Sequence, residues 1–374
     1  MGLLGQPALA KTVVYVSNAT DGDIGMYDMN PTTGALTAMG RAPAAKVVMP
    51  MAVAPDQRHL YAVVRSEPMR VLTYAIDPRS GILEAAGEAP LPDSMPYVST
   101  DRTGRFLFTA SYSGHKVAVT PIDADGRVIR SPTQIVPTGE HAHAIQADRS
   151  NRFVFATNLG SDQIAQFTFD TAQGRLVPND PPYLKTAKGE GPRHFQFSPD
   201  NRFLYLLSEL TGTLTQFAFD PATGTLSPTL SVASVPPDSG LVPGTIQPPV
   251  TAATLAARAR NDAPPQLAIA AADIQITPDG RFLVTTERTS SKLAVFRLDP
   301  ATGTPTFVSS IATVTRPRGI RIDPSSRYLI ASGEKSNDLA VYRIDGETGD
   351  LREVGRYPGG RGANWVEIVD LPAR

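Results

Sequence analysis

The chain repeats one pattern seven times. Each copy begins with a short apolar run rich in Phe, Tyr and Val, continues through a polar turn into an alternating segment, and ends in a turn of the Asp-Pro-x-Thr-Gly type. The equivalent positions are Val14, Leu60, Leu107, Val154, Leu204, Leu283 and Leu329. Successive copies are therefore 46, 47, 47, 50, 79 and 46 residues apart. A nearly constant period of this length indicates a repeat architecture built from one supersecondary unit.

The repeated unit predicts a four-stranded antiparallel sheet. Residues 214–219 alternate apolar and polar side chains, as a half-buried strand does, and a further strand such as 195–197 precedes each copy. Seven such units predict an all-β protein with the fold of a seven-bladed β-propeller, whose radial closure leaves only short strand edges. Residues 365–369 look like one more innermost strand, so we expect them to pair with the N-terminal strands and close the ring.

Two segments lie outside the repeats. Residues 1–10 are either a tail or the remaining end of a signal segment. The second alternative arises because Ala8-Leu9-Ala10 has the small-x-small form of a signal-peptidase cleavage site. Residues 11–374 are expected to form a single domain with an insertion at about 232–266, which is rich in Pro and Ala and accounts for the long step. A loop of this length is either functional or a surface excursion, and 252–257 could form a helical turn.

Composition excludes several classes of function. With 35 basic and 36 acidic residues the net charge is −1, so we expect no nucleic-acid partner and no attraction to a membrane surface. The sequence contains no run of 18 apolar residues, so we expect no membrane span. The absence of cysteine removes disulfides and thiolate chemistry. A small-molecule partner and a monomer or weak homo-oligomer are the remaining expectations.

Blade geometry should bring two sets of positions to one rim of the central channel. An innermost strand begins at the face where the turn between the second and third strands lies. The expected strand starts are Met51, Tyr97, His143, Arg193, Ala271, Arg318 and Asn364, or residues next to them. The turn positions are Ala19, Arg65, Tyr112, Leu159, Glu209, Arg288 and Glu334. Purely structural turns favour Gly, Asn, Asp and Ser, so the His, Arg and Glu side chains gathered here indicate a functional site.

Four of these rim residues are candidates for catalysis. His143 could act as a general base. Arg193 and Arg288 present guanidinium forks that suit an oxyanion or a substrate anion, or they are only ion-pair partners of Glu209 and Glu287. Glu209 would either carry a proton or orient His143 or Arg288.

Four further residues are expected to bind substrate, namely His194, Arg65, Arg318 and Glu334. His141 and His143 form an H-x-H pair of the kind that binds metals, but spacing fixes no third ligand, so we expect neither a metal nor another cofactor. The chain also has no G-x-S-x-G elbow, P-loop or dinucleotide fingerprint in a suitable context.

Several motifs resemble those of the propeller-type 6-phosphogluconolactonases. These are HAIQAD at 143–148, GPRHFQFSPDNRFLY at 191–205, SEL at 208–210, AADIQITPDGRFL at 271–283 and PRGIRIDP at 317–324. The family also contains the fungal 3-carboxy-cis,cis-muconate lactonising enzyme. The His, Arg, Glu and Arg proposed for its active site match His143, Arg193, Glu209 and Arg288 by motif.

The resemblance implies hydrolysis of a sugar-acid lactone, with 6-phosphoglucono-δ-lactone as the first candidate and the cytoplasm as the compartment. The alternatives are a non-phosphorylated lactone, cycloisomerisation of a muconate-type dicarboxylate, and a non-enzymatic binding platform. Two departures weaken the phosphorylated substrate: Asn158 stands where many members have Asp, and the insertion enters beside the strand leading to Arg288. If residues 1–10 end an export signal, the compartment is the periplasm.

Overall fold

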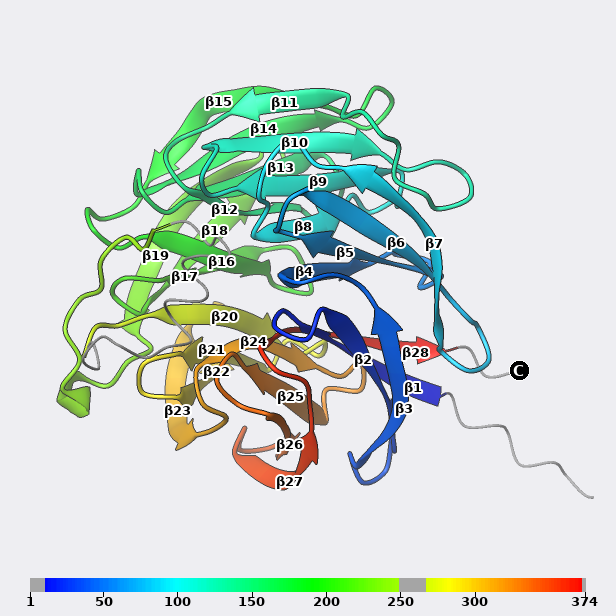
Figure 1. Ribbon diagram of the computed structural model, residues 1–374. Helices are drawn as coiled ribbons and strands as arrows, with labels where there is room; N and C mark the ends of the chain where they lie inside the picture. Colours follow the sequence, from blue (N-terminus) through cyan, green and yellow to red (C-terminus); the bar gives the residue numbers. More distant parts are fainter. Residues whose placement is uncertain (1–10, 249–266, 372–374) are drawn as a thin grey trace, which may run out of the picture.

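The chain forms a ring of seven four-stranded antiparallel sheets, as Figure 1 shows for the computed structural model. The structure describes residues 11–248 and 267–371. The tail at 1–10 and the helical turn expected at 252–257 lie outside the described residues. The predicted seven-bladed β-propeller is therefore confirmed.

Each blade runs outward from an innermost strand at the channel to an outermost strand at the periphery. The first blade contains β28 (Ala363–Leu371), β1 (Lys11–Asn18), β2 (Asp23–Met29) and β3 (Leu36–Pro43). The second contains β4 (Val48–Val53), β5 (His59–Val64), β6 (Arg70–Ile76) and β7 (Leu83–Pro90). The third contains β8 (Tyr97–Thr100), β9 (Phe106–Ser111), β10 (Lys116–Pro121) and β11 (Gln134–Pro137). The fourth contains β12 (Ala142–Ala147), β13 (Phe153–Asn158), β14 (Gln163–Asp170) and β15 (Arg175–Lys185).

The remaining blades follow the same order. The fifth contains β16 (Pro192–Phe197), β17 (Phe203–Ser208), β18 (Thr213–Asp220) and β19 (Thr225–Ala233). The sixth contains β20 (Ala271–Ile276), β21 (Phe282–Glu287), β22 (Lys292–Leu298) and β23 (Pro305–Ala312). The seventh contains β24 (Pro317–Ile322), β25 (Tyr328–Gly333), β26 (Asp338–Ile344) and β27 (Leu351–Pro358). A short 3-10 helix at Pro237–Ser239 lies between β19 and β20.

The two ends of the chain close the ring. Strand β28 pairs with β1 over the whole length of β1, from Lys11 opposite Leu371 to Asn18 opposite Ala363. The expected pairing of the C-terminal and N-terminal strands is confirmed. Because the first blade takes strands from both ends, opening the ring requires breaking this ladder.

The core lies between the blades. The apolar faces of neighbouring sheets are buried against each other, as the aromatic contacts of Phe197 illustrate: its ring centroid is 5.5 Å from that of Phe155 and 5.4 Å from that of Phe219. Each buried side chain of this size contributes about 1.5–3 kcal/mol of hydrophobic free energy. The packed blades hold the innermost strands in place around the channel.

A recurrent β-bulge at the start of the innermost strands positions the rim residues. In β12, Ala142 and Ala144 pair with the adjacent residues Asn158 and Thr157, so His143 is the extra residue. The same displacement makes Arg193, Arg318 and Asn364 the extra residues of β16, β24 and β28. A bulge bends the strand and re-aims the side chain of its extra residue.

Tyr97 and Ala271 begin β8 and β20 as expected, whereas Met51 lies three residues after the start of β4, and none of the three is a bulge residue. Met51, Tyr97 and Ala271 are paired within the ladders of their strands, opposite Ala62, Ala110 and Glu287 respectively. In β4 the bulge consists of Met49 and Pro50, and in β20 it consists of Ala272 and Asp273. The physical reason is that these two bulges contain one more residue than the bulge of β12, which shifts the alternation.

Candidate functional site

Arg193 is the most deeply placed charge at the channel mouth. Its side chain is 1% exposed, and its Nε donates a hydrogen bond of 2.8 Å to Oε2 of Glu209. Its Nη1 donates to the backbone carbonyl of Ala272 in the next blade. These two contacts hold the guanidinium in one orientation. Burial lowers the pKa of Arg193 to about 9, so the group remains charged at pH 7.

Glu209 connects two guanidinium groups. Its Oε1 accepts a hydrogen bond of 2.7 Å from Nη2 of Arg288, while Oε2 accepts the bond from Arg193. Burial alone would raise the pKa of Glu209, but the charges of Arg288 and Arg193 outweigh this effect and lower it to about 2. The carboxylate is therefore ionised at neutral pH. Of the roles that the sequence left open, these contacts favour orientation of the guanidinium groups over transfer of a proton.

Arg288 is fixed by the backbone as well as by Glu209. Its Nε donates to the carbonyl oxygen of Ala270 at 2.9 Å. Glu287, the other expected partner, forms no hydrogen bond with Arg288; it caps the turn by accepting bonds from the backbone N–H groups of Thr289 and Ser290. The expected pairing with Glu209 is confirmed for both arginines, and the pairing with Glu287 is wrong because local backbone donors occupy that carboxylate.

His143 lies beside this network and is 4% exposed. Its ring is 6.1 Å from the ring of Tyr112 and 5.2 Å from that of His194, between centroids. Burial, followed by the positive charge of Arg193, holds the pKa of His143 well below its ordinary value. A neutral imidazole is thus present at pH 7, which is the form that can accept a proton.

The seventh blade repeats the ion-pair arrangement. Nη1 of Arg318 lies 3.0 Å from Oε1 of Glu334, and Nε of Arg316 lies 3.6 Å from Oε2. In the second blade, Nε of Arg65 donates to Oγ of Ser94 at 3.0 Å. Arg65 and Arg318 are among the charges that lower the pKa of His143, after burial and Arg193. The structure therefore brings both substrate-binding candidates into the electrostatic environment of His143.

Three guanidinium groups keep donors that the protein does not use. Within residues 11–248 and 267–371, Nη2 of Arg193, Nη1 of Arg288 and Nη2 of Arg318 form no hydrogen bond. A guanidinium has five N–H donors in a planar fork, so each group can bind its carboxylate and still donate to a ligand. The arrangement can bind an anion or stabilise an oxyanion.

His194 lies immediately behind His143. Its Nδ1 is 2.9 Å from Oδ1 of Asp273, and its ring is 5.0 Å from that of Tyr97 and 5.7 Å from that of Trp365. Burial, followed by the charge of Arg193, lowers the pKa of His194 to about 4. Its assignment to substrate binding remains a prediction, since the ring is 3% exposed and one nitrogen contacts Asp273.

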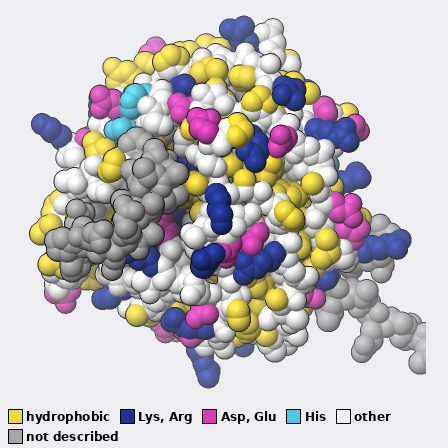
Figure 2. Space-filling view, viewed as in Figure 1, with side chains coloured by type: hydrophobic (Ala, Val, Ile, Leu, Met, Phe, Trp, Pro, Cys, Tyr) yellow, Lys and Arg dark blue, Asp and Glu magenta, His cyan; other side chains and the backbone are white. Residues whose placement is uncertain are grey.

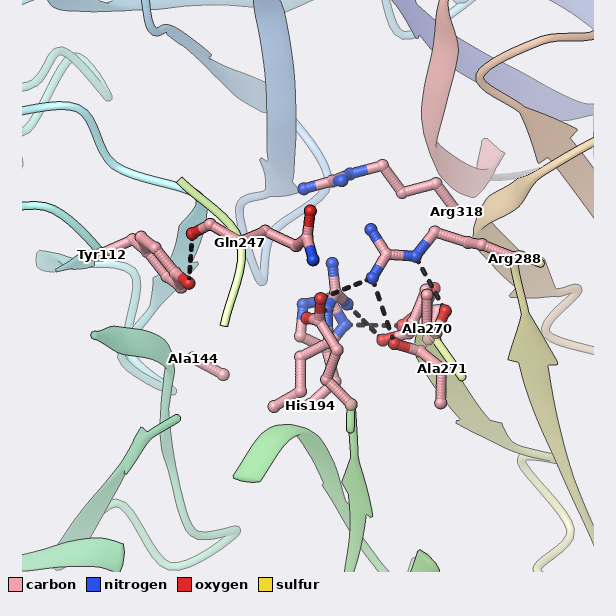
Figure 3. A network of polar contacts seen from close by, with 12 residues as sticks. Tyr112, Ala144, His194, Gln247, Ala270, Ala271, Arg288 and Arg318 are labelled. Carbon is pink, nitrogen blue, oxygen red and sulfur yellow. Dashed lines mark hydrogen bonds and ion pairs between the residues drawn. The ribbon is translucent and has the colours of Figure 1, made fainter. Parts of the chain in front are cut away.

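The insertion lies over part of the site. The backbone N–H of Gly244 donates to the carbonyl of Leu210, next to Glu209, at 2.7 Å. The hydroxyl of Tyr112 donates to the backbone carbonyl of Gln247 at 2.8 Å. In Figure 3 the side chain of Gln247 points toward the guanidinium groups of Arg288 and Arg318. Residues 244–247 of the insertion therefore lie next to the candidate site.

Sequence reasoning missed Asp273 and Gln247. Asp273 is one of the two bulge residues of β20, and its motif carried the only signal, because an acidic residue there interrupts an apolar strand start. Gln247 lies in a segment without periodicity, so nothing in the sequence distinguished it from its neighbours.

The H-x-H pair is engaged in aromatic contacts. His141 stacks on Tyr112, with centroids 4.1 Å apart, and its Nδ1 is 2.9 Å from the carbonyl oxygen of Tyr112. No group of three or more His, Asp or Glu residues is arranged to hold a metal ion in the described part of the chain. Nor does any helix among the described residues have the length and apolarity needed to cross a membrane. Figure 2 shows basic and acidic side chains next to one another near the middle of the channel face.

Comparison with known families gives the class of this propeller. Residues 13–368 match the family described as "Lactonase, 7-bladed beta-propeller". The chain belongs to this lactonase family.

Individual relatives and solved structures are similar to the chain over nearly its whole length. The chain is 36% identical over 361 residues to a 6-phosphogluconolactonase of Xenorhabdus nematophila, covering 96% of this chain and 100% of the relative. It is 37% identical over 359 residues to a 6-phosphogluconolactonase of Pectobacterium atrosepticum, covering 96% and 99%. Among solved structures, the periplasmic gluconolactonase PpgL of Pseudomonas aeruginosa superposes with a TM-score of 0.83 at 26% identity, covering 97% of this chain and 100% of the other. A protein of Lactobacillus plantarum shares the fold, with a TM-score of 0.81 at 22% identity over 97% and 100% of the two chains.

Proposed function

We propose that the chain hydrolyses a sugar-acid lactone, with 6-phosphoglucono-δ-lactone as its first candidate substrate. The observation that carries this proposal is that His143, a buried and neutral imidazole, lies beside two guanidinium groups that are bound by Glu209. Each of these guanidinium groups still has an N–H donor for a ligand. Hydrolysis of a lactone needs a base for water and positive charge for the carbonyl oxygen, and this arrangement supplies both. The names of the relatives support the same reaction class.

The reaction proceeds in two steps. His143 accepts a proton from water as the water oxygen bonds to the lactone carbonyl carbon, and the carbonyl oxygen becomes an oxyanion. As the tetrahedral species collapses, the bond from the carbonyl carbon to the ring oxygen breaks, and His143 returns the proton to that oxygen. General-base assistance of this type contributes about 10²–10⁴-fold to the rate.

The arginines divide two tasks between them. Arg193 and Arg288, fixed by Glu209, stabilise the oxyanion. Arg65 and Arg318, with Glu334, bind the outer part of the substrate, where a phosphate or carboxylate can accept hydrogen bonds from a guanidinium. His194 contributes to the wall of this site. Glu209 is a positioning residue, because its low pKa keeps it ionised throughout the neutral range.

A panel of substrates tests the proposal. Hydrolysis of 6-phosphoglucono-δ-lactone and glucono-δ-lactone would be followed with a pH indicator and corrected for spontaneous ring opening. We expect turnover of the phosphorylated lactone with the higher kcat/KM. Turnover of the unphosphorylated lactone alone would redirect the assignment to a gluconolactonase, and enzymatic turnover of neither would contradict it.

A second candidate is cycloisomerisation of a muconate-type dicarboxylate. Arg193 and Arg288, which both bind the carboxylate of Glu209, could bind two substrate carboxylates. The loss of ultraviolet absorbance of such a diene would identify this activity. Binding of a lactone without turnover would favour the third alternative, a non-enzymatic platform.

The compartment follows from the substrate. We place a phosphorylated lactone in the cytoplasm, as part of carbohydrate metabolism, with the periplasm as the alternative because PpgL is described as a periplasmic gluconolactonase. Fractionation of cells that express the full-length protein, with a cytoplasmic and a periplasmic marker, decides between the two.

A further inference from the structure

A buried chain of three side chains leads away from the channel mouth. Oδ1 of Asp273 is 2.9 Å from Nδ1 of His194, and the ring centroid of His194 is 5.2 Å from that of His143. The three residues come from β20, β16 and β12, so the chain crosses three consecutive blades. Each of the three residues is at most 6% exposed. A buried polar chain that crosses blades costs free energy unless its members satisfy one another.

Two ring nitrogens in this chain have no partner within residues 11–248 and 267–371. They are Nδ1 of His143 and Nε2 of His194, one on each of the two adjacent rings, and both are buried. The two rings are in edge contact, with centroids 5.2 Å apart, and a centroid separation of this size is compatible with an N–H of one ring reaching a nitrogen of the other. Buried nitrogens of this kind ordinarily have a partner, so each ring is the natural partner of the other.

Asp273 is held in place on both of its oxygens. Its Oδ1 also accepts from the backbone N–H of Ile274 at 2.9 Å, and Oδ2 accepts from the backbone N–H of Ile320 at 3.0 Å. These contacts tie the carboxylate to β20 and to β24. The carboxylate therefore has a fixed position from which it can orient the ring of His194.

We propose that Asp273 and His194 are positioning residues that fix His143 in the tautomer with the proton on Nδ1, leaving Nε2 as the base. This inference rests on the proposed lactonase function, in which His143 accepts the proton. An ionised Asp273 requires N–H at Nδ1 of His194, which makes Nε2 of His194 an acceptor. That acceptor then requires N–H at Nδ1 of His143, and the lone pair of His143 lies on Nε2.

Asp273 and His194 also stabilise the charged state of His143 during turnover. When Nε2 of His143 accepts a proton from water, the imidazolium donates from Nδ1 to the neutral His194, whose dipole is oriented by Asp273. No proton leaves His143 toward His194, so the same proton returns to the ring oxygen of the product. Asp273 does not touch the substrate in this scheme, and His194 influences the proton transfer only through His143.

Other charged groups around His194 also affect its pKa. Arg193 precedes it on β16, Arg318 approaches from β24, and the charges of both lower its pKa, whereas Asp273 raises it. Tyr97 on β8 contacts the ring edge-on, and burial keeps that hydroxyl protonated by raising its pKa. Since the cations oppose protonation of His194, the contact with Asp273 is what holds its proton on Nδ1.

The test is the Asp273→Asn variant of the full-length protein, compared with wild type over a range of pH. We expect kcat to fall about 10- to 100-fold, as with other residues that orient a functional imidazole, with little change in KM. The acid limb of kcat/KM should move to lower pH, because the neutral amide no longer favours the charged imidazole. A merely structural role would lower the yield of folded enzyme without moving this limb.

Nitrogen-15 NMR of the histidine rings in the wild-type protein gives a second measurement that needs no variant. We expect the Nδ1–H tautomer for both His143 and His194. The matched control is Asp101→Asn, which removes another fully buried carboxylate, one that accepts backbone bonds from Arg105 and Phe106 at the opposite end of an inner strand. This control should lose stability and keep the tautomers and the acid limb of the wild type.

The outcomes separate the two proposals. A wild-type His143 with its proton on Nε2, or an Asp273→Asn enzyme with unchanged kcat and pH profile, overturns the positioning role. If the Nδ1–H tautomers are present but no lactone is turned over, the positioning role stands and the proposed function fails. If Asp273→Asn does not fold, the wild-type tautomers still decide the question.

Discussion

Glu209 binds Arg193 through one carboxylate oxygen and Arg288 through the other, at 2.8 and 2.7 Å. The two arginines come from neighbouring blades, so this one carboxylate joins β16 and the end of β21 at the channel mouth. Breaking a buried ion pair by removing one partner leaves an uncompensated charge and costs about 3–5 kcal/mol. The geometry of both guanidinium groups therefore depends on Glu209.

The first prediction concerns the charge of this carboxylate. Glu209→Gln should lower kcat/KM about 100- to 1000-fold, because the guanidinium groups lose the anion that holds them against the oxyanion. It should also lower the melting temperature. Steady-state kinetics and thermal unfolding measure both effects.

The control for Glu209→Gln is Glu353→Gln, which breaks an exposed ion pair with Arg356. Such pairs contribute about 0–1 kcal/mol, so this variant should match the wild type in both measurements. A Glu209→Gln enzyme that also matches the wild type would show that the double ion pair plays no part in catalysis.

The second prediction concerns acid stability. The pKa of His194 is about 4 in the folded protein against an ordinary 6.5, so the unfolded chain binds more protons between these values. The resulting stability is fully present above pH 6.5 and is lost as the pH falls toward 4, by about 3 kcal/mol. His194→Gln should remove this part of the pH dependence. Urea unfolding at pH 7.5 and at pH 4.5 measures the difference, and equal pH dependence in the two proteins would refute the assignment.

The third prediction concerns the covering of the site by the insertion. Tyr112→Phe removes the hydroxyl that donates to the carbonyl of Gln247. A hydrogen bond of this kind contributes about 0.5–1.5 kcal/mol, so KM should rise about 2- to 10-fold while kcat changes little. Tyr27→Phe is the matched control, because the Tyr27 hydroxyl donates to the carbonyl of Pro358 on the outer strand of the seventh blade. An unchanged KM in Tyr112→Phe would mean that Gln247 does not help to hold the substrate.

The repeat period was sufficient to predict the blade number, the strand count and the closure of the ring. Each copy alternates strongly and is bounded by turn residues, so local and long-range signals agree. The sequence also predicted which side chains lie at the rim of the channel, because each position in the repeat corresponds to a fixed position in the blade. These residues are His143, Arg193, Glu209 and Arg288. The lengths of the bulges were not predictable, since one or two extra residues leave the same overall spacing.

Contacts between blades account for what the sequence did not reveal. Asp273 and His194 are 79 residues apart, and only the packing of β20 against β16 brings them together. The role of Glu209 likewise depends on its having two cationic partners in contact rather than one. Their effect on its pKa follows from three-dimensional distances, which a motif does not encode.

The role of His143 as the base in hydrolysis of a lactone is tested by the rate of His143→Ala on 6-phosphoglucono-δ-lactone. His59→Ala is the matched control, since His59 begins β5 and thus lies at the end of that strand away from Arg65. We expect His143→Ala to lose about 10²–10⁴-fold in kcat after correction for spontaneous opening, while His59→Ala retains the wild-type rate. A His143→Ala enzyme that folds and hydrolyses the lactone at the wild-type rate would contradict this role.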